Sequence, residues 1–202
     1  MYKFTDNKAE LNNVDIDMRR NAEGLIHEFG INVLYVRNCK FVKCRCFSDL
    51  DKTGDPDCPY CMGSGFFASI EKVQAIESSN SAYSSTNSIA QLPIGVTDQK
   101  NEVYYIGHDV TPKERDYLLK VTWDKKGKPI DIVKVLEIVN VYEMRGDGGR
   151  VELTGCVIND RTDMVKTFSK VLRQLPPAAV QYLAIGGRSI WPSRILTSKD
   201  ER

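Results

Sequence analysis

The first strong pattern along the chain is an apolar stripe with helical spacing, shortly before residue 30. Apolar residues recur there every three or four positions, as they do on one face of an α-helix: Met18, Ala22, Leu25, Ile26 and Phe29. Asp15 or Asp17 can cap the start of such a helix with its carboxylate, and Gly30 suits its end. The pattern predicts a helix that ends at about Phe29.

Two runs rich in β-branched and aromatic residues come next, and they predict strands at 31–37 and 66–76 on either side of a cysteine-containing segment. Six serines and two asparagines then fall between Ser78 and Ser88. This composition is too polar for a core and predicts a loop. The loop is either a solvated linker or a segment that becomes ordered on a partner.

Four further strands are predicted in the second half of the chain, separated by turns with glycine, proline and charged residues: 102–108, 116–123, 132–142 and 150–158. Short turns of this kind join antiparallel neighbours. The third of these strands carries Lys134, Glu137 and Asn140 rather than a polar residue at every second position. We therefore expect a β-bulge there, or a strand that is covered on both faces.

Residues 162–175 carry a second apolar face with helical spacing: Met164, Val165, Phe168, Val171, Leu172 and Leu175. Thr162 can cap this helix, and Pro176 followed by Pro177 can stop it. Residues 178–202 mix apolar, glycine and basic positions without a sustained period. They predict an arm that packs against another surface.

Together these patterns predict an α+β fold that is mainly β. Its centre is a small antiparallel β-barrel or sandwich with an inserted loop that contains the cysteines, an N-terminal helix, and a C-terminal helix with an arm. A chain of 202 residues with 42% hydrophobic content suits one ordinary core. The expected segments are the helix and lead-in strand (1–37), the cysteine insertion with its return strand (38–76), the polar loop (77–101), the β core (102–160), and the C-terminal helix and arm (161–202).

Charge and hydropathy narrow the range of partners. Lys and Arg number 28 against 27 for Asp and Glu, so the chain lacks the field that a protein coating nucleic acid uses to attract phosphates. No stretch approaches the roughly 20 apolar residues that span a bilayer, and residues 1–13 lack the apolar core of a signal peptide. We expect a soluble protein that is not secreted by that route and has no membrane partner.

Four of the six cysteines form two close pairs, Cys44-x-Cys46 and Cys58-x-x-Cys61. Structural zinc sites use four tetrahedral ligands, and two close thiolate pairs supply them at little cost in chain entropy. Gly63 and Gly65 allow the tight turns that such a site needs. The pattern predicts one structural Zn²⁺ bound by these four cysteines, and the metal would supply the stability that this polar segment cannot gain from apolar packing.

Other uses of the cysteines are a pair of disulfides, unused thiols, an iron centre held by the same four sulfurs, or a redox pair. Cys39 lies close enough in sequence to replace a ligand. Cys39 and Cys156 are more simply interpreted as buried or idle thiols.

Residues suited to catalysis are scarce. His27 and His108 are the two histidines, and no glycine-rich phosphate loop opens a helix. Four aspartates inside the cysteine segment could bind calcium, but their spacing lacks the remaining ligands of a calcium loop: Asp49, Asp51, Asp55 and Asp57. We expect a solvated acidic loop and no enzyme.

The segments CRC, DPDCPYCMGSGF, RDYLLKVTW and IVKVLEIVNVYEMRGDGGRVELTGC together resemble the zinc-bearing neck proteins of tailed bacteriophages. The motif of that family, C-x-C followed by C-P-x-C-x-G-x-G, is matched at Cys44, Cys46, Cys58, Pro59, Cys61, Gly63 and Gly65. The resemblance implies a head-to-tail connector or stopper built around a small β-barrel. Its subunits would form a homo-oligomeric ring in the neck of the virion, after assembly in the host cytoplasm.

The same resemblance implies a portal or adaptor protein on one side of the ring, a tail-terminator or tail protein on the other, and packaged DNA in the channel. The alternative from another class is a zinc-ribbon module that binds nucleic acid. In that module Lys40, Lys43 and Arg45 would face phosphates, and aromatic rings would stack on bases: Phe47, Tyr60 or Phe66.

Overall fold

The computed structural model describes residues 17–55, 58, 60–61, 63–79, 102–175, 177–184, 186 and 188–189. Within these ranges the side chains of residues 39–42, 147 and 188–189 are left undescribed. The predictions made for residues 1–16, for most of the polar loop and for residues 190–202 lie outside the described part of the chain, as do those for Pro59, Asp57 and the side chains of Cys39 and Lys40.

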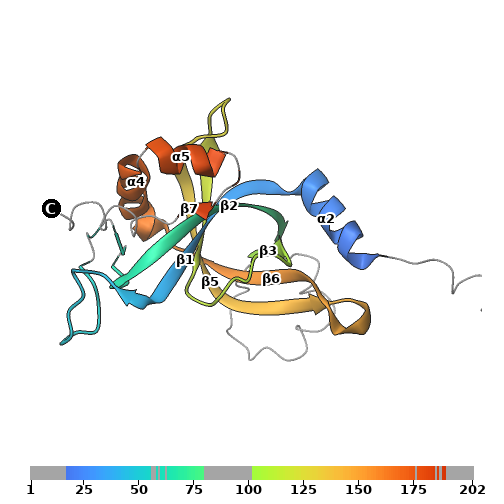
Figure 1. The fold of residues 1–202 in the computed structure, drawn as a ribbon, viewed down its shortest axis with the longest axis horizontal. Coiled ribbons are helices and arrows are strands. Elements are labelled where there is room, and N and C mark those ends of the chain that lie inside the picture. The colour runs from blue at the N-terminus through green and yellow to red at the C-terminus, as the bar shows by residue number, and fades with distance from the viewer. Residues whose placement is uncertain are drawn as a thin grey trace, which may run out of the picture.

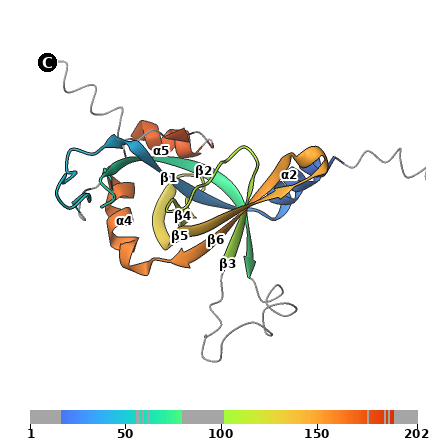
Figure 2. The same ribbon diagram turned by 90° about the horizontal axis from the view of Figure 1, so that it is seen from below.

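Six antiparallel strands form a closed barrel (Figures 1 and 2). The strands are β1 (Ile31–Lys43), β2 (Phe66–Ser79), β3 (Glu102–Gly107), β4 (Tyr117–Trp123), β5 (Pro129–Arg145) and β6 (Val151–Asp160). They follow the order β1-β4-β5-β6-β3-β2, and β1 pairs again with β2 to close the cylinder. The short strand β7 (Arg188–Ser189) pairs with β2. The expected small antiparallel barrel is thus confirmed, in preference to a sandwich.

The long strand β5 has the irregularity that its polar residues predicted. Its pairing with β6 passes from Ile138 to Asn140, and its pairing with β4 passes from Lys134 to Ile132. The two residues that the pairing skips, Val133 and Val139, remain exposed. The bulge at Val139 keeps Asn140 on the outside, because the next residue that faces the barrel interior is Val141.

The barrel carries one core inside and a second core on its outer face. The inner core is formed by buried side chains from all six strands, among them Tyr35, Tyr104 and Leu118. The outer core lies beneath two helices, α4 (Val165–Gln174) and α5 (Pro177–Ala184). Because neighbouring residues of β1 and β5 contribute to different cores, these strands are covered on both faces where α4 and α5 pack. Leu34 belongs to the outer core and Tyr35 to the inner core.

Helix α2 (Met18–Phe29) begins and ends where the sequence indicated. Asp17 caps it by accepting hydrogen bonds from the backbone N–H groups of Arg19 and Arg20, at 3.2 and 3.3 Å. Gly30 follows with an extended backbone, and a Cβ atom there would lie 2.2 Å from the carbonyl oxygen of Ile26. Close approach, rather than a left-handed conformation, therefore explains this glycine.

The predicted apolar stripe of α2 is only half buried. Ala22 and Ile26 contact the barrel, whereas Met18, Leu25 and Phe29 are exposed. The helix lies at one end of the barrel, and α4 lies at the other end (Figure 2). Since α2 meets the barrel along one edge, the remaining apolar positions face outward.

Two predictions for the C-terminal region are wrong. Thr162 does not cap α4: residues Thr162–Met164 form a 3₁₀ turn, and within the described residues no side chain caps α4. Residues 178–184, which were assigned to an arm without a sustained period, belong instead to helix α5, with Leu183 fully buried. An eight-residue helix is too short to display a clear period, and Pro177 at its first position suits a helix start.

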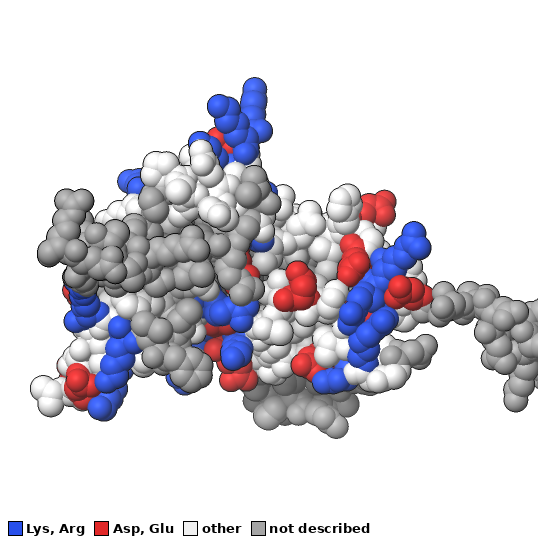
Figure 3. All heavy atoms as spheres, in the orientation of Figure 1, with Lys and Arg blue, Asp and Glu red and all other residues white. Residues whose placement is uncertain are grey.

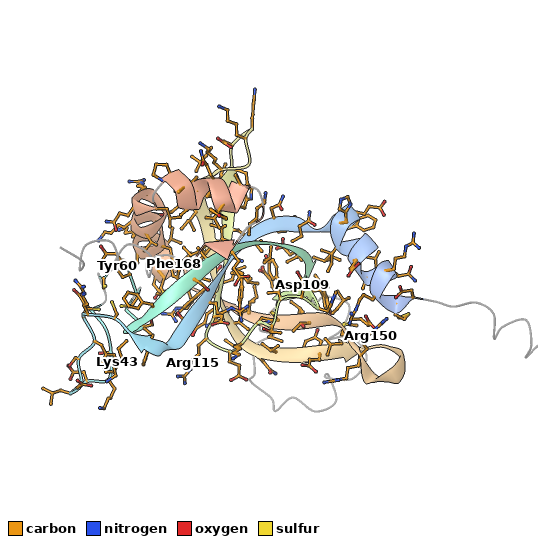
Figure 4. All side chains as sticks on the ribbon, in the orientation of Figure 1. Lys43, Tyr60, Asp109, Arg115, Arg150 and Phe168 are labelled. Carbon is orange, nitrogen blue, oxygen red and sulfur yellow. The ribbon has the colours of Figure 1, made fainter. Side chains whose placement is uncertain are left out.

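Ion pairs connect the start of α2 with β6. Glu152 is almost fully buried and accepts from Arg19 Nε at 3.1 Å and Arg150 Nε at 2.7 Å, while Arg150 also lies 3.3 Å from Asp17. The hydrogen bond from Arg150, followed by that from Arg19, lowers the pKa of the Glu152 carboxyl despite the opposing effect of burial. Arg150 is labelled beside α2 in Figure 4.

Replacing Phe168 with Ala should lower the free energy of unfolding by about 3–5 kcal/mol. The ring is 1% exposed in the outer core and packs on Tyr117, with ring centroids 5.2 Å apart. Urea denaturation measures the loss, and Lys166→Ala on the exposed side of α4 serves as the control. Equal stability of the two variants would show that α4 does not need this ring.

Glu152→Gln should speed hydrogen exchange in the backbone of α2, since a neutral amide holds the two arginines less strongly. In the wild type the contribution of Glu152 is complete above the usual carboxyl pKa of about 4.3. It is lost only as the pH falls through the lowered pKa of the folded state. Glu28→Gln, on the exposed side of α2, should leave exchange unchanged; acceleration in both variants would contradict the role given to Glu152.

Candidate metal centre

The four paired cysteines converge in the connection between β1 and β2, at the same end of the barrel as α4 (Figure 1). Cys44 directly follows the last residue of β1. Cys58 and Cys61 lie on the returning segment, which enters β2 at Phe66. Their sulfur atoms and that of Cys46 all lie within 4.8 Å of one another.

The sulfur positions suit a tetrahedral metal ion. Four thiolates about 2.3 Å from a central zinc would stand about 3.8 Å from one another. Cys44 Sγ and Cys58 Sγ are 3.7 Å apart, and Cys46 Sγ and Cys61 Sγ are 3.3 Å apart. A disulfide requires about 2.05 Å, and all four residues are free thiols. The arrangement therefore fits four metal ligands better than two disulfides.

Backbone hydrogen bonds build this arrangement from two tight turns. The N–H of Phe47 donates to the carbonyl oxygen of Cys44, and the N–H of Ser64 donates to that of Cys61, each at 3.0 Å. The N–H of Cys44 donates to the carbonyl oxygen of Gly65 at 2.8 Å, which holds the two turns side by side. The strand pair thus continues into the cluster and positions both cysteine pairs.

Glycines are needed where the two turns meet. Gly65 has φ +76°, and a Cβ atom there would lie 2.5 Å from the Phe47 ring. A Cβ atom on Gly54 would lie 2.8 Å from Cys61 Sγ. The sequence motif drew attention to Gly65 but not to Gly54. Gly54 could have been noticed only because it is the one glycine in the polar sequence between the two cysteine pairs.

Aromatic and charged side chains surround the cluster. Phe67 packs on Cys44, Cys58 and Cys61, and the rings of Phe47 and Phe66 lie 5.3 Å apart. Lys43 Nζ sits 4.5 Å from the Phe47 ring centroid and 2.8 Å from Asp49. Figure 4 shows Lys43 and Tyr60 at this end of the molecule.

The thiols differ in their acidity. Burial raises the pKa of Cys44 to about 11 and also raises that of Cys61. Cys46 is the most exposed of the four; burial opposes ionisation there too, but hydrogen bonds from the Asp55 backbone and the neighbouring cysteines lower its pKa. A metal ion that binds here must replace protons on the buried sulfurs.

The aspartates of this segment that the structure describes do not converge on a second metal site. Asp49 pairs with Lys43, and Asp51 accepts a hydrogen bond from Ser48 Oγ at 3.1 Å. Within the described ranges, the four cysteines are the one set of three or more potential metal ligands that converges.

The remaining singled-out residues lie elsewhere. His27 and His108 line one hollow of about 720 Å³ between α2 and the barrel, where His108 Nδ1 lies 3.6 Å from a Glu23 carboxylate oxygen. Nothing in the sequence pattern indicated that the two histidines would line the same hollow. Cys156 lies in the inner core of the barrel, and burial raises the pKa of its thiol to about 12.

No protein-family model matches this chain, and no curated protein matches it significantly. Among the described residues there is no helix with both the length and the apolar character needed to cross a membrane.

We expect the purified protein to bind about one zinc ion per chain, and Cys58→Ser to weaken that binding by more than about 100-fold. Loss of a direct ligand should cost more than loss of an outer-shell partner, which costs 10- to 100-fold. Elemental analysis and competition with a chromogenic chelator measure both quantities. Cys156→Ala removes a cysteine outside the cluster and should retain the metal; equal zinc content in both variants would contradict the ligand set.

Proposed function

We propose that this protein is a structural subunit of the neck of a tailed bacteriophage, with a zinc ion that stabilises the loop between β1 and β2. The observation that carries the proposal is a small closed barrel with four converging cysteines on the connection between two paired strands. This is the combination that the sequence resemblance implies. The subunit would act as a connector or stopper between portal and tail.

Zinc is the ion that the donor set favours. Four cysteine sulfurs in a tetrahedral arrangement select zinc or iron, and a fully protein-ligated zinc site has a structural role. The loop between β1 and β2 gains little stability from apolar packing, since Leu50 is 94% exposed and Tyr60 is 36% exposed. Because few of the described apolar side chains of this segment are buried apart from the cysteines, the metal would provide most of its stability.

A ring of subunits is supported by the apolar surface that the barrel leaves uncovered. Met18, Leu25 and Phe29 form an exposed stripe on α2, and Tyr142 and Met144 are exposed on β5. Scattered apolar residues are common on protein surfaces, but a stripe along one helix is typical of an interaction site. A ring needs two different contact surfaces on each subunit, and these two regions are candidates for them.

The zinc-ribbon alternative has less support from the contacts around the cluster. Lys43 is already paired with Asp49 and covers the Phe47 ring, and Phe47 packs on Phe66. A module that reads nucleic acid needs cations and aromatic faces that are free to contact it. The packing around the cysteines instead suits a metal site that stabilises the fold.

Cys58→Ser in the phage that encodes this chain should yield filled heads and finished tails that fail to join. The expected reason is that the loop between β1 and β2 loses its metal and its shape. Electron microscopy of the lysate counts joined particles, and Cys156→Ala is the matched control.

Cryo-electron microscopy of the intact virion is the direct test of location, and a ring of this chain below the portal is the expected result. Normal particle yield from a variant shown to lack zinc would contradict the structural role of the metal. Absence of the chain from purified virions would overturn the neck assignment.

A further inference from the structure

The hairpin between β4 and β5 is a rigid projection. Asp124 Oδ1 accepts hydrogen bonds from the backbone N–H groups of Lys126 and Lys128, at 2.8 and 2.7 Å. The N–H of Asp124 donates to the carbonyl oxygen of Lys128 at 2.8 Å, and Gly127 takes the left-handed conformation with φ +72°. This hairpin extends from the top of the molecule in Figure 1.

The tip of this projection carries unpaired positive charge. Lys125 and Lys126 are exposed and Lys128 is half-buried, and none of the three forms an ion pair with any residue in the described ranges. Asp124 Oδ1 accepts the hydrogen bonds of the turn, and the Asp124 carboxylate forms no ion pair with these lysines among the described residues. Figure 3 shows Lys or Arg side chains extending from this point into solvent.

Helix α5 completes a hollow beside the lysines. Lys126, Lys128, Gln181 and Tyr182 line a depression of about 430 Å³, and Tyr182 is 51% exposed. A Cβ atom on Gly127 would lie 3.3 Å from the carbonyl oxygen of Ala184, so the turn rests against the end of α5. The hairpin and the helix therefore hold their polar side chains on one surface.

The contrast with the cysteine cluster identifies this surface as the better site for a polyanion. Lys43 is held by Asp49, whereas the hairpin lysines have no such partner among the described residues. Lys, Gln and Tyr side chains are also the groups that contact phosphate oxygens in protein–DNA complexes without reading sequence.

We propose that Lys125, Lys126 and Lys128, together with Gln181 and Tyr182, form a contact surface for the phosphate backbone of duplex DNA. A role for this contact in the neck would rest on the proposed function, but the binding surface itself does not depend on it. A near-neutral chain with three such cations should bind weakly and with a strong salt dependence. Three neutralised phosphates correspond to a slope of about −2.7 in a plot of log K against log salt.

The test is fluorescence anisotropy of a labelled 20-base-pair duplex with the full-length, zinc-loaded protein at several NaCl concentrations. Lys125→Gln/Lys126→Gln/Lys128→Gln should weaken binding at least tenfold at low salt and bring the slope close to zero. The matched control is Arg20→Gln/Lys52→Gln/Lys113→Gln, which removes the same charge from exposed positions elsewhere. It should stay within twofold of the wild type and keep the slope.

Thermal unfolding and zinc content establish that both triple variants are folded. Equal losses in the two variants would overturn the proposal, because net charge alone would then account for binding. Tighter binding to polyglutamate than to the duplex would identify an acidic protein partner instead and would also overturn it. Since the measurement uses the isolated protein, a negative result leaves the virion experiments on Cys58→Ser unaffected.

Discussion

The pairing of β1 with β2 is the constraint on which the rest of the structure depends. Their antiparallel register runs from Ile31 opposite Ala75 to Asn38 opposite Ala68, and it converts an open sheet into a closed barrel. The same two strands support the other parts of the molecule. Helix α2 leads into β1, β7 pairs with β2, and the connection between them carries the four cysteines. Closure also removes the free edges through which open sheets aggregate.

Much of the fold could be predicted from local sequence patterns. Alternation and turn residues predicted the strands, and the misplaced polar residues of 132–142 predicted the bulge that Val139 provides. Closure could not be predicted in the same way, because it depends on which distant strands pair. Thr162 was misassigned since a 3₁₀ turn precedes α4. Helix α5 was missed because it has only eight residues and is apolar at most of them, so it shows no clear helical period.

For the candidate site, the spacing of the cysteines predicted that two pairs would meet, and their sulfur atoms do converge. What the spacing could not predict was the supporting structure. Gly54 approaches Cys61 through the fold of the polar loop, and Lys43 reaches Asp49 across the turn. The exposed half of the apolar stripe on α2 shows that sequence periodicity does not predict burial. Periodicity predicts which residues share a face, but only the arrangement of neighbouring elements decides how much of that face is covered.

The position of the cysteine connection has a mechanical consequence. It joins two long antiparallel strands, and each of these is also hydrogen-bonded to a second neighbour, β1 to β4 and β2 to β3. A force applied to this connection along the strands would pull β1 and β2 lengthwise past those neighbours. The hydrogen bonds of the three residue pairs between β1 and β4 and the five between β2 and β3 would then carry the force together rather than opening one after another. The barrel should therefore resist a pulling force that is applied to the connection between β1 and β2.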